Sequence, residues 1–139
     1  MTISKYIVDF LKKIGGIEID TNHVQDGSDQ YGLFKAPSRN KKDYNDGSYE
    51  VTEFYQFLAR LDSVSDTERK ESDEILEDLT YKLDDYKYEY DYPVIDKNRK
   101  VTDISVTGCP YPLATEERGT MYQMSLSITY EREVSKGLD

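Results

Sequence analysis

The sequence predicts an α+β fold in which two helices pack on one face of an antiparallel sheet of about four strands. Two segments repeat apolar residues at the spacing of a helix, and several others alternate apolar and polar residues as half-buried strands do. Their order along the chain is helix, hairpin, helix, strand, strand, which favours antiparallel pairing. With 139 residues the chain suits a single domain, residues 1–139.

The clearest predicted strand covers residues 120–131, TMYQMSLSITYE. Its large apolar residues recur at every second position, and they are Tyr122, Met124, Leu126, Ile128 and Tyr130. At ~3.3 Å per residue this strand spans roughly 35 Å, which is long for a small protein. We therefore expect it in the centre of the sheet, with the other elements packed on it or paired with it.

Two helices are predicted. Residues 3–14 have the apolar spacing of an amphipathic helix, which Gly15 and Gly16 end. The second helix is predicted over residues 65–85, because Ser65 to Glu68 forms a capping box and an apolar stripe follows it. The other face of this helix is strongly acidic, and it has three interpretations: a solvated surface, a mimic of DNA, or the acidic wall of a channel.

Shorter segments complete the predicted sheet. We expect strands at residues 17–20, 30–35, 49–60 and 101–107. The polar residues 36–48 are predicted to form a long loop closed by a turn at Asp46 and Gly47. The prolines at positions 110 and 112 are expected to stop the strand before them, with a loop at 113–119 and a frayed tail at 134–139.

Charge and composition disfavour several classes of protein. The formal net charge is -10 and the pI is about 4.6, which disfavours direct binding of DNA through its phosphates, so we expect no sequence-specific nucleic-acid partner. No run approaches the ~18 apolar residues that a membrane span needs, so we expect no membrane partner. The single cysteine, Cys109, allows no intrachain disulfide, which fits a reducing compartment.

No catalytic or metal-binding motif is found, so we expect no enzyme activity, no cofactor and no metal. His23 lies alone in a polar segment, and the acids near it lack the spacing of a calcium loop. Cys109 has no basic neighbour in sequence that would activate it as a nucleophile. Glu53 is the one oddly placed carboxylate, on an otherwise apolar strand face, and it is either a tuned acid or a carboxylate at an edge or interface.

Two groups of residues are candidates for interfaces. The first is the dense basic cluster of the predicted loop, which is either a solvated loop tip or a docking site for an acidic partner, and it contains Arg39, Lys41 and Lys42. The second is a row of tyrosines at every second position: Tyr86, Tyr88, Tyr90 and Tyr92. In an extended segment all four rings line one side, where they form a subunit interface or pack over the edge of the core; glycan binding is a third interpretation.

Several stretches of the chain resemble one family of phage proteins. They are ISKYIVDFL near the start, IEIDTNHVQDGSDQYGLFKAP, YEVTEFYQFLAR followed by SVSDTERKESDE, and above all NRKVTDISVTGCPYPLATEERGTMYQMSLSITYERE. They are similar to small proteins encoded in the tail-assembly region of Clostridia-type phages, prophages and phage-tail-like particles, which are described as tail-terminator, tail-completion or minor capsid proteins. The resemblance covers nearly the whole chain and implies a tail-terminator-like fold.

This resemblance implies a structural role. Proteins of the family form a ring, typically a hexamer, at the head-proximal end of the tail tube, where the ring stops tube polymerisation. The implied partners are further copies of the chain, the tail tube protein, and sheath, neck or collar proteins. The implied location is the tail of a virion or tail-like particle assembled in the bacterial cytoplasm. The alternative is an acidic binding module, such as a DNA mimic or an inhibitor of a host nucleic-acid enzyme.

Overall fold

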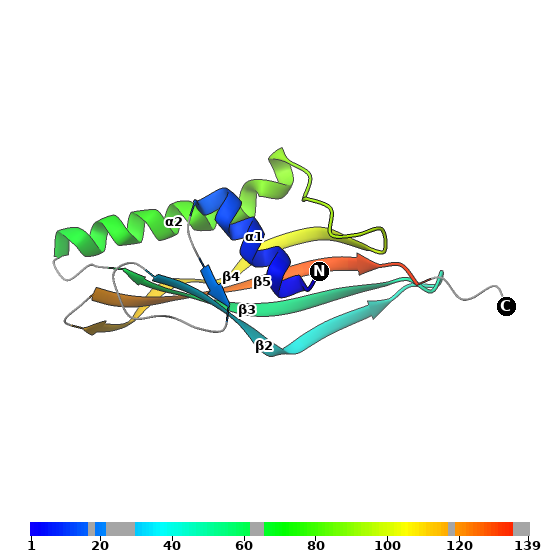
Figure 1. The fold of residues 1–139 in the computed structure, drawn as a ribbon, viewed down its shortest axis with the longest axis horizontal. Helices are drawn as coiled ribbons and strands as arrows, with labels where there is room; N and C mark the ends of the chain where they lie inside the picture. Colours follow the sequence, from blue (N-terminus) through cyan, green and yellow to red (C-terminus); the bar gives the residue numbers. More distant parts are fainter. Residues whose placement is uncertain (17–18, 22–29, 62–65, 117–118, 135–139) are drawn as a thin grey trace.

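The computed structural model describes residues 1–16, 19–21, 30–61, 66–116 and 119–134. Two helices and five strands follow in the order α1 (Ile3–Gly15), β1 (Ile19–Thr21), β2 (Gln30–Asp43), β3 (Tyr49–Leu61), α2 (Asp66–Glu89), β4 (Arg99–Glu116) and β5 (Gly119–Arg132). The strands form one sheet of order β1-β2-β3-β5-β4, in which β2, β3, β5 and β4 pair antiparallel and the short β1 joins β2 in parallel. Both helices pack on one side of the sheet (Figure 1), which confirms the predicted α+β class.

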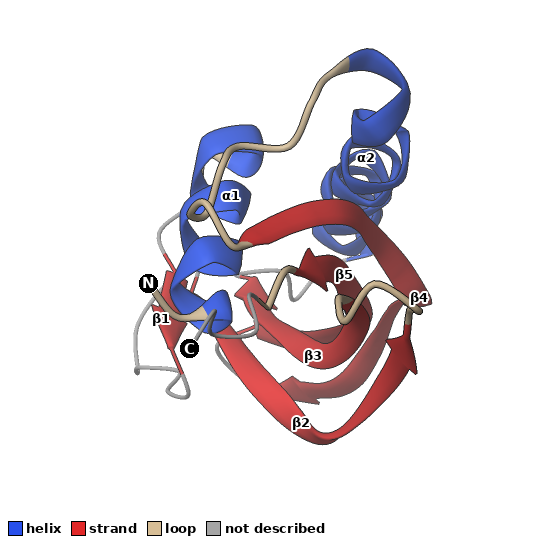
Figure 2. Ribbon diagram, turned by 90° about the vertical axis from the view of Figure 1, so that its right-hand side faces the viewer, coloured by secondary structure: helices blue, strands red, loops and turns tan. Residues whose placement is uncertain are grey.

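The long strand predicted over residues 120–131 is confirmed as an interior strand. β5 pairs with β3 along one side and with β4 along the other. Its predicted apolar face is buried, and so are Thr120 and Ser127. β3 alternates in the same way, with Val51, Tyr55 and Phe57 buried on the face that meets the helices. Seen from the side in Figure 2, the sheet is strongly curved, with β2 at its lower side, α2 above it and α1 at its left.

The two helices supply the other half of the core. Thr2 caps α1, because its side chain accepts a hydrogen bond from the Lys5 backbone N–H at 3.1 Å. Gly16 ends α1 in the left-handed region, at φ 63°, where a side chain would be strained. The apolar stripe of α1 belongs to one core cluster with buried residues of β3 and β5, and its Phe10 packs against Tyr86 near the end of α2. Helix α2 adds Leu76, Leu79 and Leu83 to the same core.

The predicted loop at residues 36–48 is wrong. β2 continues to Asp43, and residues 39–43 pair with β3 beyond a bulge between Lys35 and Arg39. The predicted turn is confirmed but is short, with the Tyr44 N–H donating to the Ser48 carbonyl at 3.0 Å and Gly47 at φ 90°. The strand lacked apolar alternation because it is an edge strand whose polar residues stay in solvent.

The predicted end of the strand at residue 107 is also wrong. β4 continues to Glu116, through both prolines and several register shifts. An edge strand tolerates proline where its missing N–H faces away from the neighbouring strand. Bulges shift the register, so the pairing with the neighbouring strand can resume beyond an irregular residue. Gly108 allows this strand to approach β5 closely, because a Cβ added there would lie 3.1 Å from the Cβ of Ser125.

Candidate functional site

The three basic residues predicted at a loop tip lie instead on strand β2. Arg39 and Lys41 are opposite Glu53 and Val51 of β3, so their side chains lie on the helix side of the sheet, whereas Lys42 is on the other side. All three are exposed. We call Arg39, Lys41 and Lys42 the basic edge.

The basic edge belongs to a part of β2 that has a neighbouring strand on one side alone. β1 pairs with residues 31–33 of β2 and, within the described residues, no strand continues beside residues 35–43. Lys41 Nζ lies 3.4 Å from Oδ1 of the adjacent Asp43. Arg39 and Lys42 form no ion pair with any described residue, so their charges are available to another molecule.

The outward face of α2 has the opposite charge. The buried side of this helix contains Ser72, Leu76, Leu79 and Leu83. On the opposite side the exposed acids are Glu71, Glu74, Glu77, Asp78 and Asp85. Glu77, Asp78 and Asp85 lie within about one turn of Tyr81, which is 57% exposed and donates a hydrogen bond from its hydroxyl to Glu77 Oε1 at 3.3 Å. Asp78 also pairs with Lys82 at 3.0 Å. We call these five acids together with Tyr81 the acidic face of α2.

The four tyrosines do not form one row, so the extended geometry predicted for them is wrong. α2 includes Tyr86 and Tyr88, and in a helix residues two positions apart point to different sides. The rings of Tyr86 and Tyr92 pack against Phe10, with centroids 4.8 and 5.8 Å from its ring. Tyr88 and Tyr90 are 78% and 62% exposed. Two of the rings therefore belong to the core edge. Tyr88 and Tyr90 remain exposed to a partner, and the Tyr90 ring also lies 5.1 Å from the Tyr86 ring.

Side chains of α2 and of the segment after it close the sheet edge formed by β4. The backbone N–H of Ile104 donates to the hydroxyl oxygen of Tyr92 at 3.0 Å, and the N–H of Val106 donates to Oδ1 of Asp84 at 2.8 Å. Burial raises the pKa of Tyr92, which keeps its hydroxyl protonated. Two outward donors of this edge are thereby satisfied within the chain.

Glu53, the carboxylate on the apolar face of β3, is 5% exposed. Its Oε1 accepts from the Tyr55 hydroxyl at 3.0 Å and lies 3.1 Å from Lys35 Nζ, and its Oε2 accepts from the Tyr130 hydroxyl at 2.8 Å. Burial opposes the charged form, but the bonds from Tyr130, Lys35 and Tyr55 outweigh it and hold the pKa of Glu53 below its ordinary value.

The surroundings of Glu53 favour a structural carboxylate over a tuned acid. Its low pKa keeps it ionised at neutral pH, where a general acid would need a raised one. Burial and the bond to Glu53 raise the pKa of Tyr130 to about 12, so this phenol remains a donor. The carboxylate lines neither of the cavities found among the described residues.

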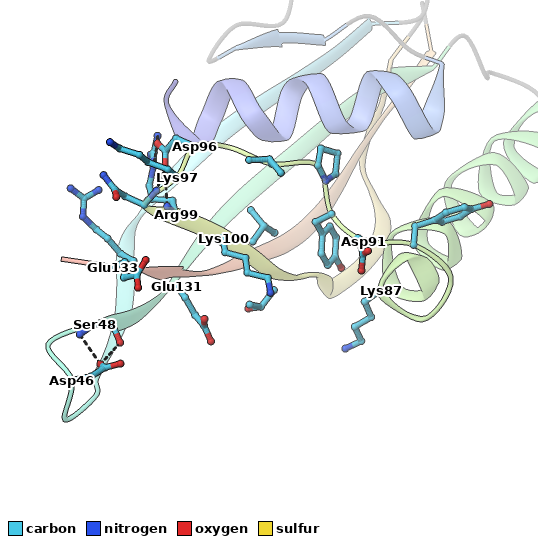
Figure 3. A pocket seen from close by; sticks show the side chains of 18 residues that line it. Asp46, Ser48, Lys87, Asp91, Asp96, Lys97, Arg99, Lys100, Glu131 and Glu133 are labelled. Carbon is cyan, nitrogen blue, oxygen red and sulfur yellow. Dashed lines mark hydrogen bonds and ion pairs between the residues drawn. The ribbon is translucent and has the colours of Figure 1, made fainter. Parts of the chain in front are cut away.

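An open cleft of about 840 Å³ lies beside the start of β4 (Figure 3). Its walls are the segment 90–94, the start of β4, the end of β5 and the β2–β3 turn. Its charged lining residues balance: Lys87, Lys97, Arg99, Lys100 and Arg132 against Asp46, Asp91, Asp96, Glu131 and Glu133. A lining without net charge favours neither a polyanion nor a metal cation, and the exposed Tyr90 on its wall suits a protein partner.

The described ranges contain no candidate for a metal site or a membrane span. There, no three His, Cys, Asp or Glu side chains gather as a metal site would require. None of the described helices is long and apolar enough to cross a membrane. His23 and Ser65 of the predicted capping box lie outside the described residues. Cys109 is exposed and forms no disulfide.

Sequence comparison assigns no family, because no family model and no curated protein sequence matches the chain. The candidate surfaces are therefore the basic edge, the acidic face of α2 and the exposed tyrosines at the end of that helix. Sequence reasoning missed Asp84, whose role depends on α2 lying beside β4. It also missed Lys35 as the partner of Glu53, since that pair depends on the register of β2 against β3.

Proposed function

We propose that this chain is a structural subunit of a phage tail or phage-tail-like particle. In this proposal, copies of the chain assemble into a ring, typically a hexamer, at the head-proximal end of the tail tube. The ring ends polymerisation of the tube and binds neck or collar proteins. The proposal rests on the resemblance of the quoted sequence stretches to tail-terminator proteins, and it places the protein in the tail after assembly in the bacterial cytoplasm.

The structural observation that supports the proposal is that an unpaired strand edge and several aromatic side chains are exposed to other chains. Residues 35–43 of β2 have no strand on their outer side among the described residues, and Tyr81, Tyr88 and Tyr90 are exposed. Aromatic side chains are enriched where proteins meet, and a ring covers a sheet edge that a monomer exposes. A function through surface complementarity needs such surfaces and no reacting group.

The exposed tyrosines give the ring a second contact surface. Tyr88 and Tyr90 lie at the end of α2, and Tyr90 with Val94 forms a wall of the cleft beside β4. We assign this end of the molecule to the tail tube protein or to a sheath, neck or collar protein. Substituting Tyr88 and Tyr90 by serine is expected to weaken that contact and leave the fold intact.

Tail length is the direct test of the proposed function. Particles produced without this gene are expected to carry over-long or ragged tubes in negative-stain electron microscopy, because nothing stops the addition of tube subunits. A plasmid copy of the gene should restore the normal length. Correctly capped tails of normal length in the absence of the gene would contradict the proposal.

The acidic binding module remains the second candidate, and the acidic face of α2 favours it. A rod of carboxylates can occupy the phosphate-binding groove of a nucleic-acid enzyme. A gel-shift competition assay separates the two functions. A DNA mimic displaces DNA from a host enzyme, whereas a tail protein leaves the enzyme–DNA complex unchanged.

A further inference from the structure

The basic edge lies on β2 near one edge of the sheet, whereas α2 lies beside β4 at the other edge. α2 lies above the sheet in Figures 1 and 2, whereas β2 forms its lower side in both views. The two surfaces therefore cannot meet within one copy of the chain. Each is exposed, and neither the Arg39 nor the Lys42 charge forms an ion pair with a described residue.

We propose that the basic edge of one copy docks against the acidic face of α2 in the next copy. This inference rests on the proposed function, and it names the surfaces that join neighbouring subunits of the ring. The contact is head-to-tail, since different surfaces of identical subunits meet. Contacts of this kind generate a closed ring when the rotation between subunits closes and a filament when it does not.

The two surfaces are opposite in charge, and the acidic face is long enough to cover the basic edge. Residues 39–42 of β2 span roughly 10 Å at ~3.3 Å per residue, and residues 71–85 of α2 span roughly 21 Å at ~1.5 Å per residue. Lys and Arg side chains on both faces of the edge strand can reach carboxylates on either side of Tyr81. The Tyr81 ring is exposed at the centre of that face and offers a cation–π contact to Lys or Arg.

This arrangement assigns the acidic face of α2 to a subunit contact. The same side chains cannot also line a channel, so the lumen of the ring would be formed by other surfaces. The basic edge also explains why the outer side of β2 can remain without a neighbouring strand. Its charges discourage nonspecific pairing with other strand edges, but they allow binding to an acidic partner.

The test measures self-association of the full chain by analytical ultracentrifugation and native mass spectrometry. The first variant combines Arg39→Glu, Lys41→Glu and Lys42→Glu, which places like charges on both sides of the contact. We expect a loss of affinity of about tenfold or more, because like charges across an interface oppose association. Wild-type assemblies should also dissociate between about 0.05 M and about 1 M salt, where the screening length falls from over ~10 Å to ~3 Å.

Two further variants make the result specific. The matched control combines Lys5→Glu, Lys12→Glu and Lys13→Glu, which makes the same change in net charge on helix α1, and it should assemble like the wild type. The rescue adds Glu71→Lys, Glu74→Lys and Glu77→Lys to the first variant, which reverses both surfaces and should restore assembly. Circular dichroism at low salt checks that each variant is folded.

Each outcome decides the inference. Loss in the first variant together with recovery in the rescue supports it. A wild-type chain that stays monomeric at low salt, a first variant that assembles normally, or a control that fails equally overturns it. If the wild type forms a ring and the charge-reversed variant forms the same ring, the proposed function stands and the subunits meet through a different interface. Tails of normal length in particles without the gene would contradict the proposed function, whatever this assay shows.

Discussion

The two edges of the sheet are completed in different ways. At β4, the outward N–H groups of Ile104 and Val106 are bonded by Tyr92 and Asp84 of the same chain. At β2, no described strand lies beyond residues 31–33, and the rest of the edge carries Arg39, Lys41 and Lys42. One edge is closed by the chain itself, and the other presents charge to the solvent.

This difference separates residues that hold the fold from residues available for assembly. A donor that is satisfied internally contributes to stability, and its loss leaves a buried group unpaired. A surface charge contributes little to the stability of the monomer, so a cluster of them at an edge has to be explained by another role. Substitutions at β4 should therefore change unfolding, and substitutions at the outer part of β2 should change association.

The largest effect is expected at Glu53, which joins the edge strand to the interior through Lys35 and Tyr130. Glu53→Gln should lower the free energy of unfolding by about 1–3 kcal/mol, because two buried hydroxyls lose a charged acceptor. Urea unfolding measures this change in free energy. Glu50→Gln on the same strand is the control, since Glu50 is bonded by the exposed Tyr44 hydroxyl, and its effect should stay below about 0.5 kcal/mol. Equal effects at the two positions would contradict a special role for Glu53.

The contribution of Glu53 should depend on pH with a definite sign. Its folded-state pKa is below the ordinary value, so its stabilisation is fully present above the unfolded pKa of about 4.3 and is lost as the pH falls through the folded value. The difference in unfolding free energy between wild type and Glu53→Gln should therefore shrink from about pH 7 to about pH 3. A difference that grows toward acid pH would show that the pKa is raised instead.

A smaller effect is expected at the closed edge. Asp84→Ala removes the acceptor of the Val106 N–H and should cost about 0.5–1.5 kcal/mol in unfolding free energy. Asp84→Asn keeps an oxygen acceptor at the same place and should retain most of the stability. If Asn and Ala destabilise equally, the hydrogen bond at this edge is not the reason for the loss.

The smallest effect on stability is expected at the open edge. Lys42→Ala removes a side chain whose one described contact is with the Tyr44 ring, 5.8 Å from its centroid. The unfolding free energy should change by no more than about 0.5 kcal/mol, as checked by thermal unfolding at high salt, where the proposed ring would be dissociated. A larger loss would show that the basic edge holds the monomer together.

The sequence predicted the interior of this fold better than its edges. The β3 and β5 strands bury alternate residues, so period-two patterns located them, and the helix stripe located α1. Residues 39–43 and 108–116 lacked that pattern because edge strands keep polar residues and prolines in solvent. The tyrosines at alternate positions imitated a strand, but Tyr86 packs against Phe10 and α2 continues past it.

The candidate surfaces were harder to predict than the elements. The basic cluster and the acidic helix face are visible in the sequence, but their separation follows only from the sheet order and from the position of α2 beside β4. The partners of Glu53 likewise come from three strands, whose register a single sequence does not give.

Hydrogen exchange read by mass spectrometry tests most directly whether one edge is closed by the chain and the other by a second copy. Peptides covering residues 35–43, 71–85 and 104–106 would be compared at low salt, where the proposed ring would be assembled, and at high salt, where it would be dissociated. We predict that protection of 35–43 and 71–85 falls on dissociation while that of 104–106 is unchanged. Unchanged exchange at 35–43, or an equal change at 104–106, would contradict this account.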